Sequence, residues 1–419
     1  MMSKEKRRVP KLRFPGFTED WEQRKLGSIG STYTGLSGKT KEDFGHGEAE
    51  YITYLNVFQN TISDIIMTDK VEIDTTQNEV KYGDVLFTTS SETPEEVGMS
   101  SVWLGDTPNI YLNSFCFGFR PNQKINPYFL GYSLRAPYMR DKIKILAQGI
   151  SRYNISKNKV MELEISLPNY EEQKLLGTFL QRIDLIITLH QRKLDNLKLK
   201  KKALLQKLFP KNGERYPELR FPGFTDAWEQ RKLGAMCSLF TDGDWIESKD
   251  QSNEGIRLIQ TGNIGVGKFI DKPENKKWIS HSTFNNLKCK ELLDGDILIS
   301  RLPQPAGRAC IINTNNEKWI TAVDCTIVRL LDQYSNKFIL QSLCTYSYFH
   351  LIDSFLAGGT RQRVSRSNLS DINIMSPEKI EQDKIGLFFE CIDNLITLHQ
   401  RKLDHLKLQK KALLQQMFV

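Results

Sequence analysis

The chain repeats itself, and this duplication constrains its fold more than any other feature. Residues 12–27 read LRFPGFTEDWEQRKLG and residues 219–234 read LRFPGFTDAWEQRKLG, so that only two positions differ. A second near-identical pair closes each copy, with TLHQRKLDNLKLKKKALLQ at 188–206 and TLHQRKLDHLKLQKKALLQ at 397–415. The 419 residues are therefore one structural unit written twice.

The two copies share their ends but differ in their middles. Residues 30–125 and 237–330 have little in common beyond short pieces, such as GDVLF at 83–87 and GDILI at 295–299. The matching ends indicate a function that is common to both copies. The divergent middles indicate that each copy also has a function of its own. The pattern is that of a protein that recognises its target in two parts.

The middles have the pattern of mixed α/β domains. Short β-rich runs alternate with Gly, Asn, Asp and Pro turn signals. The runs lie at 51–55, 84–88, 255–259 and 296–300. We expect a curved mixed sheet in each copy, with one helix over 127–146 and its counterpart over 336–356. Each middle would then be an α/β domain of about 150 residues.

After Pro168 the pattern changes to apolar residues spaced alternately four and three apart, and the second copy repeats it. This heptad spacing predicts a coiled-coil helix of about 35 residues, about 50 Å long, in each copy. If the two helices pack together, chain connectivity makes them antiparallel, with the domains at opposite ends of a rod. The predicted seam residues are Leu176, Leu180, Ile183, Ile187, Leu194, Leu197, Leu204, Leu208, Ile385, Phe389, Ile392, Ile396, Leu403, Leu406, Leu413 and Met417.

Both copies interrupt the apolar seam at the same two places, His190 and Lys201 in the first and His399 and Lys410 in the second. Polar seam residues can specify the register or the partner of a coiled coil. Alternatively, these side chains extend outward to water along the helix surface. Both interpretations are compatible with the sequence.

The expected fold class is therefore mixed α/β (α+β). Two homologous recognition domains are separated by two long helices that form an antiparallel coiled coil with pseudo-twofold symmetry. The segments are recognition domain 1 at 11–170, spacer helix 1 at 171–209, a linker at 210–217, recognition domain 2 at 218–379 and spacer helix 2 at 380–419.

Composition indicates a cytoplasmic protein with a polyanionic partner. No run approaches the roughly 18 apolar residues of a spanning helix, and the start MMSKEKRRVP lacks the apolar stretch of a signal peptide. The formal charge of +8 fits a partner such as nucleic acid. The odd number and scattered spacing of the seven cysteines favour reduced thiols over disulfides or a zinc site. They are Cys116, Cys237, Cys289, Cys310, Cys325, Cys344 and Cys391.

With its repeated LRFPGFT leader and its matching segments at 167–209 and 376–418, the chain resembles the specificity subunit of type I restriction-modification systems over nearly its whole length. The resemblance implies a complex with two modification (methyltransferase) subunits and, for cleavage, two restriction subunits. Each recognition domain would read one half of a split, asymmetric DNA site, and the helices would set the gap and dock the modification subunits. S-adenosylmethionine, ATP and Mg²⁺ would bind to those partners, so that only the assembled complex would be an adenine methyltransferase and ATP-dependent endonuclease.

No catalytic or metal-binding residue is expected in this chain. The segment Gly35–Thr40 has glycines too close together for a P-loop, and Asn126-Pro127-Tyr128 lacks the second proline of an amino-methyltransferase motif and fits a helix start better. The six histidines have no metal-ligand spacing. An enzyme with an unrecognised site is the alternative, which incubation with DNA, S-adenosylmethionine, Mg²⁺ and ATP would test.

Affinity for DNA comes mainly from Lys and Arg on phosphates, and discrimination comes from side chains on base edges. The loop at 300–308 offers two arginines and a glutamine held by prolines, whereas the corresponding loop at 88–96 is rich in hydroxyls and acids and should prefer other bases. The segments at 149–153 and 359–363 recur in both copies, which favours phosphate anchoring. Each of these segments is equally compatible with an ordinary surface turn.

The predicted DNA-contacting residues are polar or basic and lie in these loops or in neighbouring turns. They are Lys39, Lys41, Ser90, Ser91, Asn113, Arg152, Tyr153, Thr241, Asp242, Asp244, Asn263, Arg301, Gln304, Arg308, Arg361, Gln362 and Arg363. The basic run at 198–202 and its partner at 407–411 either face DNA along the rod or form a solvated face. A protein-binding scaffold is the remaining alternative, and it predicts no salt-dependent DNA binding.

Overall fold

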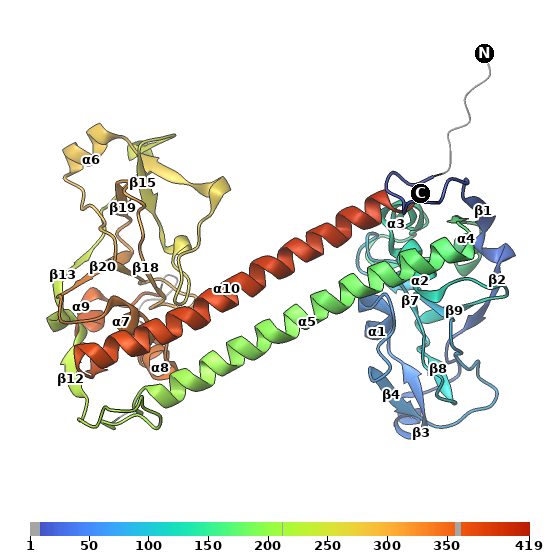
Figure 1. Ribbon diagram of the computed structural model, residues 1–419, viewed down its shortest axis with the longest axis horizontal. Coiled ribbons are helices and arrows are strands. Elements are labelled where there is room, and N and C mark those ends of the chain that lie inside the picture. The colour runs from blue at the N-terminus through green and yellow to red at the C-terminus, as the bar shows by residue number, and fades with distance from the viewer. Residues whose placement is uncertain (1–8, 212, 357–361) are drawn as a thin grey trace, which may run out of the picture. The chain divides into compact units, whose positions relative to one another are not determined.

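The computed structural model describes residues 9–211, 213–356 and 362–419. The chain forms two compact units, the first made of residues 1–191 and 401–419 and the second of residues 192–400. Two long helices, α5 (Tyr170–Leu208) and α10 (Lys379–Gln416), each contribute to both units (Figure 1). At 1.5 Å per residue, the 39 residues of α5 span about 58 Å.

The first unit contains two small sheets with short helices. A four-stranded antiparallel sheet has the order β2-β9-β5-β7, and a three-stranded sheet has the order β4-β3-β8. The bounds of these strands are β2 (Gly30–Thr34), β3 (Phe44–Ile52), β4 (Thr68–Val71), β5 (Val85–Thr88), β7 (Ser100–Val102), β8 (Ile110–Leu112) and β9 (Cys116–Pro121). Two-stranded pairs join β1 (Glu22–Lys25) to β11 (Glu164–Leu167) and β6 (Ser90–Ser91) to β10 (Tyr153–Asn154). The helices are α1 (Tyr54–Gln59), α2 (Pro127–Arg135), α3 (Pro137–Ile145) and α4 (Lys157–Met161).

The second unit repeats this plan. Its four-stranded sheets have the orders β13-β20-β17-β18 and β14-β16-β15-β19, and β12 (Glu229–Lys232) pairs with β21 (Asn373–Ser376). The strand bounds are β13 (Cys237–Asp242), β14 (Gln251–Ser252), β15 (Ile256–Ile259), β16 (Lys277–Ile279), β17 (Ile297–Ser300), β18 (Ala309–Ile311), β19 (Trp319–Thr321) and β20 (Cys325–Leu330). The helices are α6 (His281–Leu287), α7 (Asn336–Ser342), α8 (Tyr346–Ser354) and α9 (Arg366–Ser370).

Two expectations are corrected. The two domains have two larger sheets each, and additional two-stranded pairs, rather than one curved sheet each. The helices predicted over 127–146 and 336–356 are each divided in two. Proline disfavours the helical conformation of the residue before it, and Ala136, which precedes Pro137, is extended at φ −64° and ψ 146°. In the second unit the extended residue Thr345 caps α8 instead, since its side chain accepts a hydrogen bond from the Tyr348 N–H.

The GD pair that both middles share closes the same turn in each unit. Gly83 and Gly295 have φ of 87° and 89°, a conformation that glycine adopts readily. The following buried aspartates, Asp84 and Asp296, each accept a hydrogen bond from a backbone N–H three residues before them. Each aspartate also pairs with an arginine of the neighbouring strand, at 2.6 and 2.7 Å. The recurrence of GD is therefore structural.

The end of one long helix completes the aromatic core of each unit. In the first unit Phe418, just beyond α10, contacts Trp21 of the leader and Phe129 of α2, with ring centroids 6.3 and 5.7 Å away. In the second unit Phe209, just beyond α5, lies 6.0 Å from Trp228. These rings are almost fully buried. Each domain thus depends on the helix that belongs to the other copy.

The long helices pair antiparallel within each unit. In the first unit Leu176 and Leu180 of α5 share a core cluster with Met417, just beyond α10, and Asp184, further along α5, binds Lys410 of α10, which lies before Met417 in the chain. All sixteen predicted seam residues are buried or half-buried. The helices α5 and α10 therefore form an antiparallel coiled coil.

The two lysines of the seam are held by aspartates of the facing helix. Lys410 Nζ lies 2.6 Å from Asp184 in the first unit, and Lys201 Nζ lies 2.6 Å from Asp393 in the second. Both lysines are mostly buried, which favours the register interpretation over outward extension into water. Lys201 also approaches Asp393 beside Gln341, whose amide donates to the same carboxylate.

The repeated leader is anchored by a buried ion pair in each unit. Arg13 donates two hydrogen bonds to Glu172 at 2.7 and 2.8 Å, and Arg220 donates two to Glu381 at 2.8 Å. Both carboxylates are 0% exposed and lie in the first turn of a long helix. Hydrogen bonding to Glu381 raises the pKa of Arg220, so the guanidinium keeps its charge.

Replacing Arg220 with alanine should destabilise the second unit, because the Glu381 carboxylate would stay buried without its cation. Breaking a buried pair in this way costs about 3–5 kcal/mol. The matched control is Arg231→Ala, which removes an arginine from an exposed pair with Glu229. Urea denaturation of the full chain should show a much larger fall in the free energy of unfolding for Arg220→Ala. Equal losses would contradict an anchoring role.

Candidate DNA-recognition surface

A turn between two strands has the same construction in both units. In the first unit the turn 113–116 links β8 to β9, and the Cys116 N–H donates to the Asn113 carbonyl at 3.0 Å. In the second unit the turn 322–325 links β19 to β20, and Cys325 donates to Ala322 at 2.9 Å. Both turns lie beside the loop that was predicted to contact DNA. They therefore provide a common reference for comparing the two loops.

Backbone hydrogen bonds attach each loop to its turn. In the first unit the Thr89 N–H donates to the Phe115 carbonyl at 2.9 Å, and the Thr89 carbonyl accepts from Ile155 at 2.9 Å. In the second unit Arg301 takes the place of Thr89. Its N–H donates to the Asp324 carbonyl at 2.9 Å, and its carbonyl accepts from Val364 at 3.1 Å.

Five of the predicted residues gather around the turn of the first unit. Ser91 pairs with Tyr153 between β6 and β10, and the Arg152 side chain donates to Ser90 Oγ at 3.3 Å. Asn113 fixes the turn by accepting a hydrogen bond from the Phe115 N–H at 2.9 Å. We call Ser90, Ser91, Asn113, Phe115, Arg152 and Tyr153 the first-domain cluster. Phe115 is the member that sequence reasoning missed.

The second unit places arginines and aspartates at the corresponding turn. Arg301 and Arg366 approach the Asp242 carboxylate at 3.5 and 3.7 Å, and Arg363 approaches Asp324 at 3.8 Å. We call Asp242, Arg301, Asp324, Arg363 and Arg366 the second-domain cluster. Asp324 and Arg366 were not predicted. Arg366 follows the cap Ser365 as Lys157 follows Ser156, so alignment of the repeats offered a signal for it.

Several predicted residues use their side chains within the protein. Arg308 donates to the carbonyls of Ile264, Pro305 and Thr261, and burial lowers its pKa. Asn263 is buried, accepts from the Gln260 N–H and donates to the Ile270 carbonyl. These two residues hold loops in place, and their polar groups are hydrogen-bonded within the protein.

The other predicted residues of the second unit are spread around its loops. Asp244 accepts from the Lys290 N–H at 2.8 Å, and Thr241 is half-buried on β13. Gln304 and Gln362 are exposed. Arg361 lies outside the described residues.

The predicted alignment of the shared segment is wrong by one residue. It matched Arg152 and Tyr153 to Gln362 and Arg363. Ile155 and Val364, however, donate equivalent hydrogen bonds, which aligns Asn154 with Arg363. Arg363 therefore occupies a position that carries no cation in the first domain.

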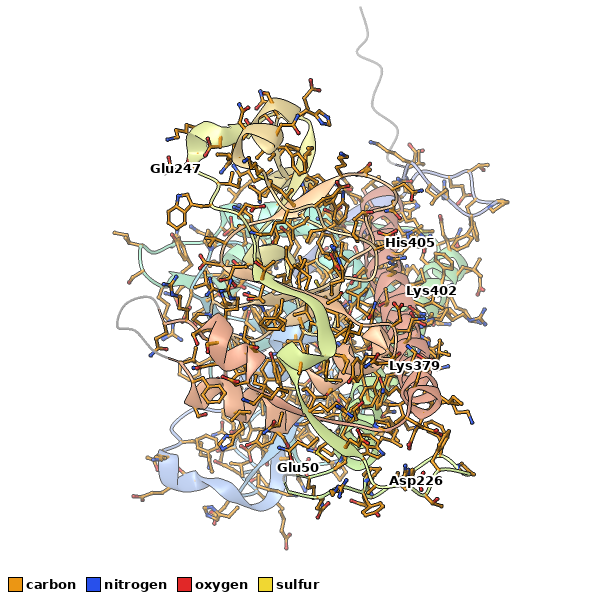
Figure 2. The ribbon with its side chains drawn as sticks, turned by 90° about the vertical axis from the view of Figure 1, so that its left-hand side faces the viewer. Glu50, Asp226, Glu247, Lys379, Lys402 and His405 are labelled. Atoms are coloured by element: carbon orange, nitrogen blue, oxygen red, sulfur yellow. The ribbon has the colours of Figure 1, made fainter. Side chains whose placement is uncertain are left out.

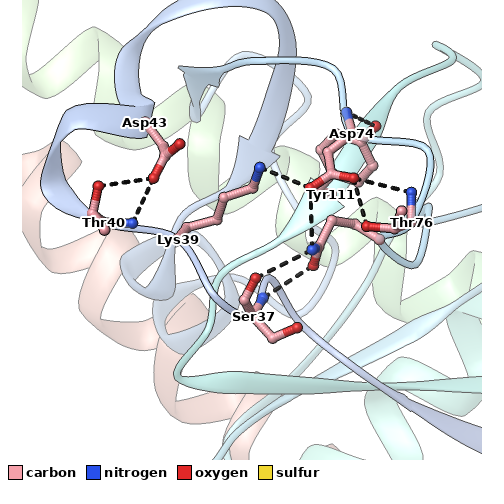
Figure 3. Close-up of polar contacts among 8 residues, drawn as sticks. Ser37, Lys39, Thr40, Asp43, Asp74, Thr76 and Tyr111 are labelled. Carbon is pink, nitrogen blue, oxygen red and sulfur yellow. Dashed lines mark hydrogen bonds and ion pairs between the residues drawn. The ribbon is translucent and has the colours of Figure 1, made fainter.

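The two predicted lysines of the first unit differ in their surroundings. Lys39 Nζ lies 2.8 Å from Asp74, whose carboxylate also accepts from the side chain and the N–H of Thr76 (Figure 3). The hydrogen bond with Lys39 is the largest cause that lowers the pKa of Asp74, and it also raises the pKa of Lys39. Lys41 is exposed in a short 3-10 helix. Lys39 thus forms a structural ion pair with Asp74, whereas the exposed Lys41 can contact DNA.

Different residues support the two loops. In the first unit Arg140 of α3 donates to the carbonyls of Val97 and Gly98, and burial lowers its pKa to about 10. In the second unit the buried hydroxyl of Tyr348, on α8, donates to the Gly307 carbonyl at 3.0 Å. Neither residue was singled out from the sequence, because these contacts depend on the tertiary fold.

The described part of the chain contains no group of three or more His, Cys, Asp or Glu residues that could hold a metal ion. Its seven cysteines are free thiols. Across residues 9–211, 213–356 and 362–419, none of the helices is both long and apolar enough to cross a membrane.

Comparison with known proteins identifies the family. Residues 18–199 and 225–408 both match the family described as the type I restriction modification DNA specificity domain. The chain belongs to this family and is a type I restriction-modification specificity subunit with two target-recognition domains.

Relatives match over most of their length. A Methanocaldococcus jannaschii protein named as the MjaX specificity subunit of a type I restriction enzyme is 26% identical, over 94% of this chain and 92% of its own. The MjaVIII specificity subunit of the same organism is 23% identical, over 96% and 92%. A solved structure of the type I restriction-modification S subunit from M. genitalium shares the fold, with a TM-score of 0.59, 16% identity and coverage of 98% and 99%.

Replacing Lys39 should affect the stability of the protein, whereas replacing Lys41 should affect its binding to DNA. Lys39→Met should lower stability at neutral pH, because ionised Asp74 loses its cation. Since Asp74 has a lowered pKa in the folded state, this loss should be full above about pH 4, shrink as the pH falls below that ordinary carboxyl value, and vanish only well below it, where Asp74 is protonated in the folded state too. Lys41→Met should leave stability unchanged and reduce the salt dependence of DNA binding by about one phosphate contact. Thermal unfolding against pH and binding against salt would measure both effects, and a loss of stability with Lys41→Met would contradict the distinction.

Proposed function

We propose that each of the two domains reads one half of a bipartite, asymmetric DNA site, and that the long helices set the gap between the halves. The observation that carries the proposal is the pair of equivalent loops and turns, which share a backbone frame and present different side chains. The shared backbone frame supports docking of both domains on DNA in the same way. The different side chains support recognition of a different sequence by each domain. The formal charge of +8 supports a DNA partner.

The chemistry is proposed to lie in partner subunits. We propose that modification subunits bind S-adenosylmethionine and methylate adenine, and that restriction subunits use ATP and Mg²⁺ to cut DNA. Relatives are named as specificity subunits, which supports a non-catalytic role for this chain. Free thiols and a DNA partner favour the cytoplasm as its compartment.

The long helices carry the same exposed apolar residues in each unit, which supports two equivalent docking sites. The first unit exposes Leu189 and Leu408, and the second exposes Leu398 and Leu199, all at 54–66%. Exposed polar side chains also lie on these helices, for example Lys402 and His405 on α10 (Figure 2). Apolar side chains rimmed by polar ones are typical of protein interfaces. One modification subunit on each set would give the proposed stoichiometry of two.

The proposed DNA specificity is tested by sequencing the methylome of a methylation-free host that co-expresses this chain with its modification subunit. We expect one new methylated motif made of two short parts with an unspecified gap. No motif, from a complex shown to assemble, would contradict the proposal and favour a protein-binding scaffold.

The docking sites are tested by native mass spectrometry of the assembled complex. Leu199→Glu should weaken only the site on the second unit and leave complexes with one modification subunit, because a charge in an apolar contact is costly to bury. Leu199→Glu with Leu408→Glu should leave none. Lys200→Glu is the matched control, an exposed neighbour with no apolar contact to lose. Two bound subunits with the double variant would contradict docking at these residues.

A further inference from the structure

The two recognition domains differ most sharply in chemistry at one equivalent turn position. Phe115 and Asp324 are both the third residue of a four-residue turn. Both carbonyls accept a hydrogen bond from the loop that follows β5 in the first unit and β17 in the second. The residues that flank the turns also agree in register, since Leu112 pairs with Ile52 as Thr321 pairs with Ile259. One backbone site thus carries a phenyl ring in one domain and a carboxylate in the other.

Phe115 presents an apolar surface in polar surroundings. The residue is 55% exposed, and the Arg152 guanidinium lies 5.8 Å from the ring centroid. The hydroxyl of Thr89 does not compete for a ligand, because it donates to the Phe115 carbonyl at 2.7 Å. A large aromatic ring kept in water beside a cation is poorly placed for folding. It is well placed to cover an apolar group on DNA.

Asp324 presents a carboxylate among arginines. Its side chain is 34% exposed, and the 61%-exposed Arg363 lies 3.8 Å away. Arg301 is buried and fixed, since it donates to the Val323 carbonyl at 2.8 Å and approaches Asp242. The arginines offset the repulsion between Asp324 and DNA phosphates. The carboxylate itself has only acceptor atoms.

We propose that this turn position determines specificity in both domains, with Phe115 covering the C5-methyl group of a thymine and Asp324 accepting a hydrogen bond from the 4-amino group of a cytosine. In the major groove the thymine methyl is the apolar group, and cytosine and adenine offer amino donors. Adenine also presents its N7 acceptor beside that donor, which repels a carboxylate, so cytosine fits Asp324 better. The inference rests on the proposed function and specifies the chemistry of its sites.

The test uses the complex of the full chain with its modification subunit, on duplexes that carry the motif found in the methylome. Each thymine in the half-site of the first domain is replaced in turn by uracil, which lacks only the methyl group. Each cytosine in the other half-site is replaced by an analogue that lacks the 4-amino group. Affinities are compared for the wild type, Phe115→Ala and Asp324→Ala.

One uracil should weaken wild-type binding about three- to tenfold and leave the Phe115→Ala complex unaffected, because that variant has already lost the contact. One cytosine analogue should likewise weaken the wild type about tenfold and leave Asp324→Ala unaffected. The control variants Tyr82→Ala and Asp371→Ala remove exposed side chains that belong to neither cluster and should respond to the analogues as the wild type does.

Equal sensitivity of the wild type and Phe115→Ala to every uracil would overturn the assignment of Phe115, and the same result with the cytosine analogue would overturn that of Asp324. In both cases sequence-specific binding of the complex would persist, so the proposed function would stand. Absence of a motif, or of sequence-specific binding, would overturn the proposed function and this inference with it.

Discussion

The rest of the structure depends on the insertion of a helix end from one repeat into the core of the other. Phe418 contacts Trp21 in the first unit and Phe209 contacts Trp228 in the second, and all four rings are nearly or fully buried. Aromatic side chains of this size dominate core energetics. Neither domain can complete its core from its own repeat alone, which couples the recognition domains to the coiled coil.

The coiled coil contains ion pairs between the helices in addition to these apolar contacts. Lys410 with Asp184 and Lys201 with Asp393 are the same contact made twice, once in each unit. A partly buried pair adds little net stability, but a shift in register would leave its charges without partners. The apolar seam holds the helices together, and the ion pairs select one alignment. A fixed alignment is what a constant gap between two half-sites requires.

The parts of the fold that repeat or follow a period could be predicted from the sequence. The duplication and heptads gave the two domains and the two long helices, and the predicted boundary at 170/171 lies at the first residues of α5. The break at Ala136–Pro137 was missed, although the proline was a local signal for it. The two sheets of each domain depend on pairings between distant strands, which short β-rich runs do not specify.

The site was predictable only where a loop could be placed by comparison of the repeats. Ser90, Arg152 and Arg301 were found in this way and do lie at the equivalent loops. Arg308 lies in a loop whose residues are typical of base recognition, but in the folded chain its guanidinium donates hydrogen bonds to backbone carbonyls. Phe115 was missed because an aromatic residue next to a strand is usually part of a core, and only its exposure distinguishes it.

In this protein the shared ends of the two copies position the two domains, and each divergent middle reads its own half-site. This division is tested most directly by exchanging residues 237–379 for the corresponding segment of another family member and sequencing the methylome of a methylation-free host with the modification subunit. One half of the methylated motif should change, while the other half and the gap length stay the same. A change in both halves, or in neither, from an assembled and active complex would contradict it.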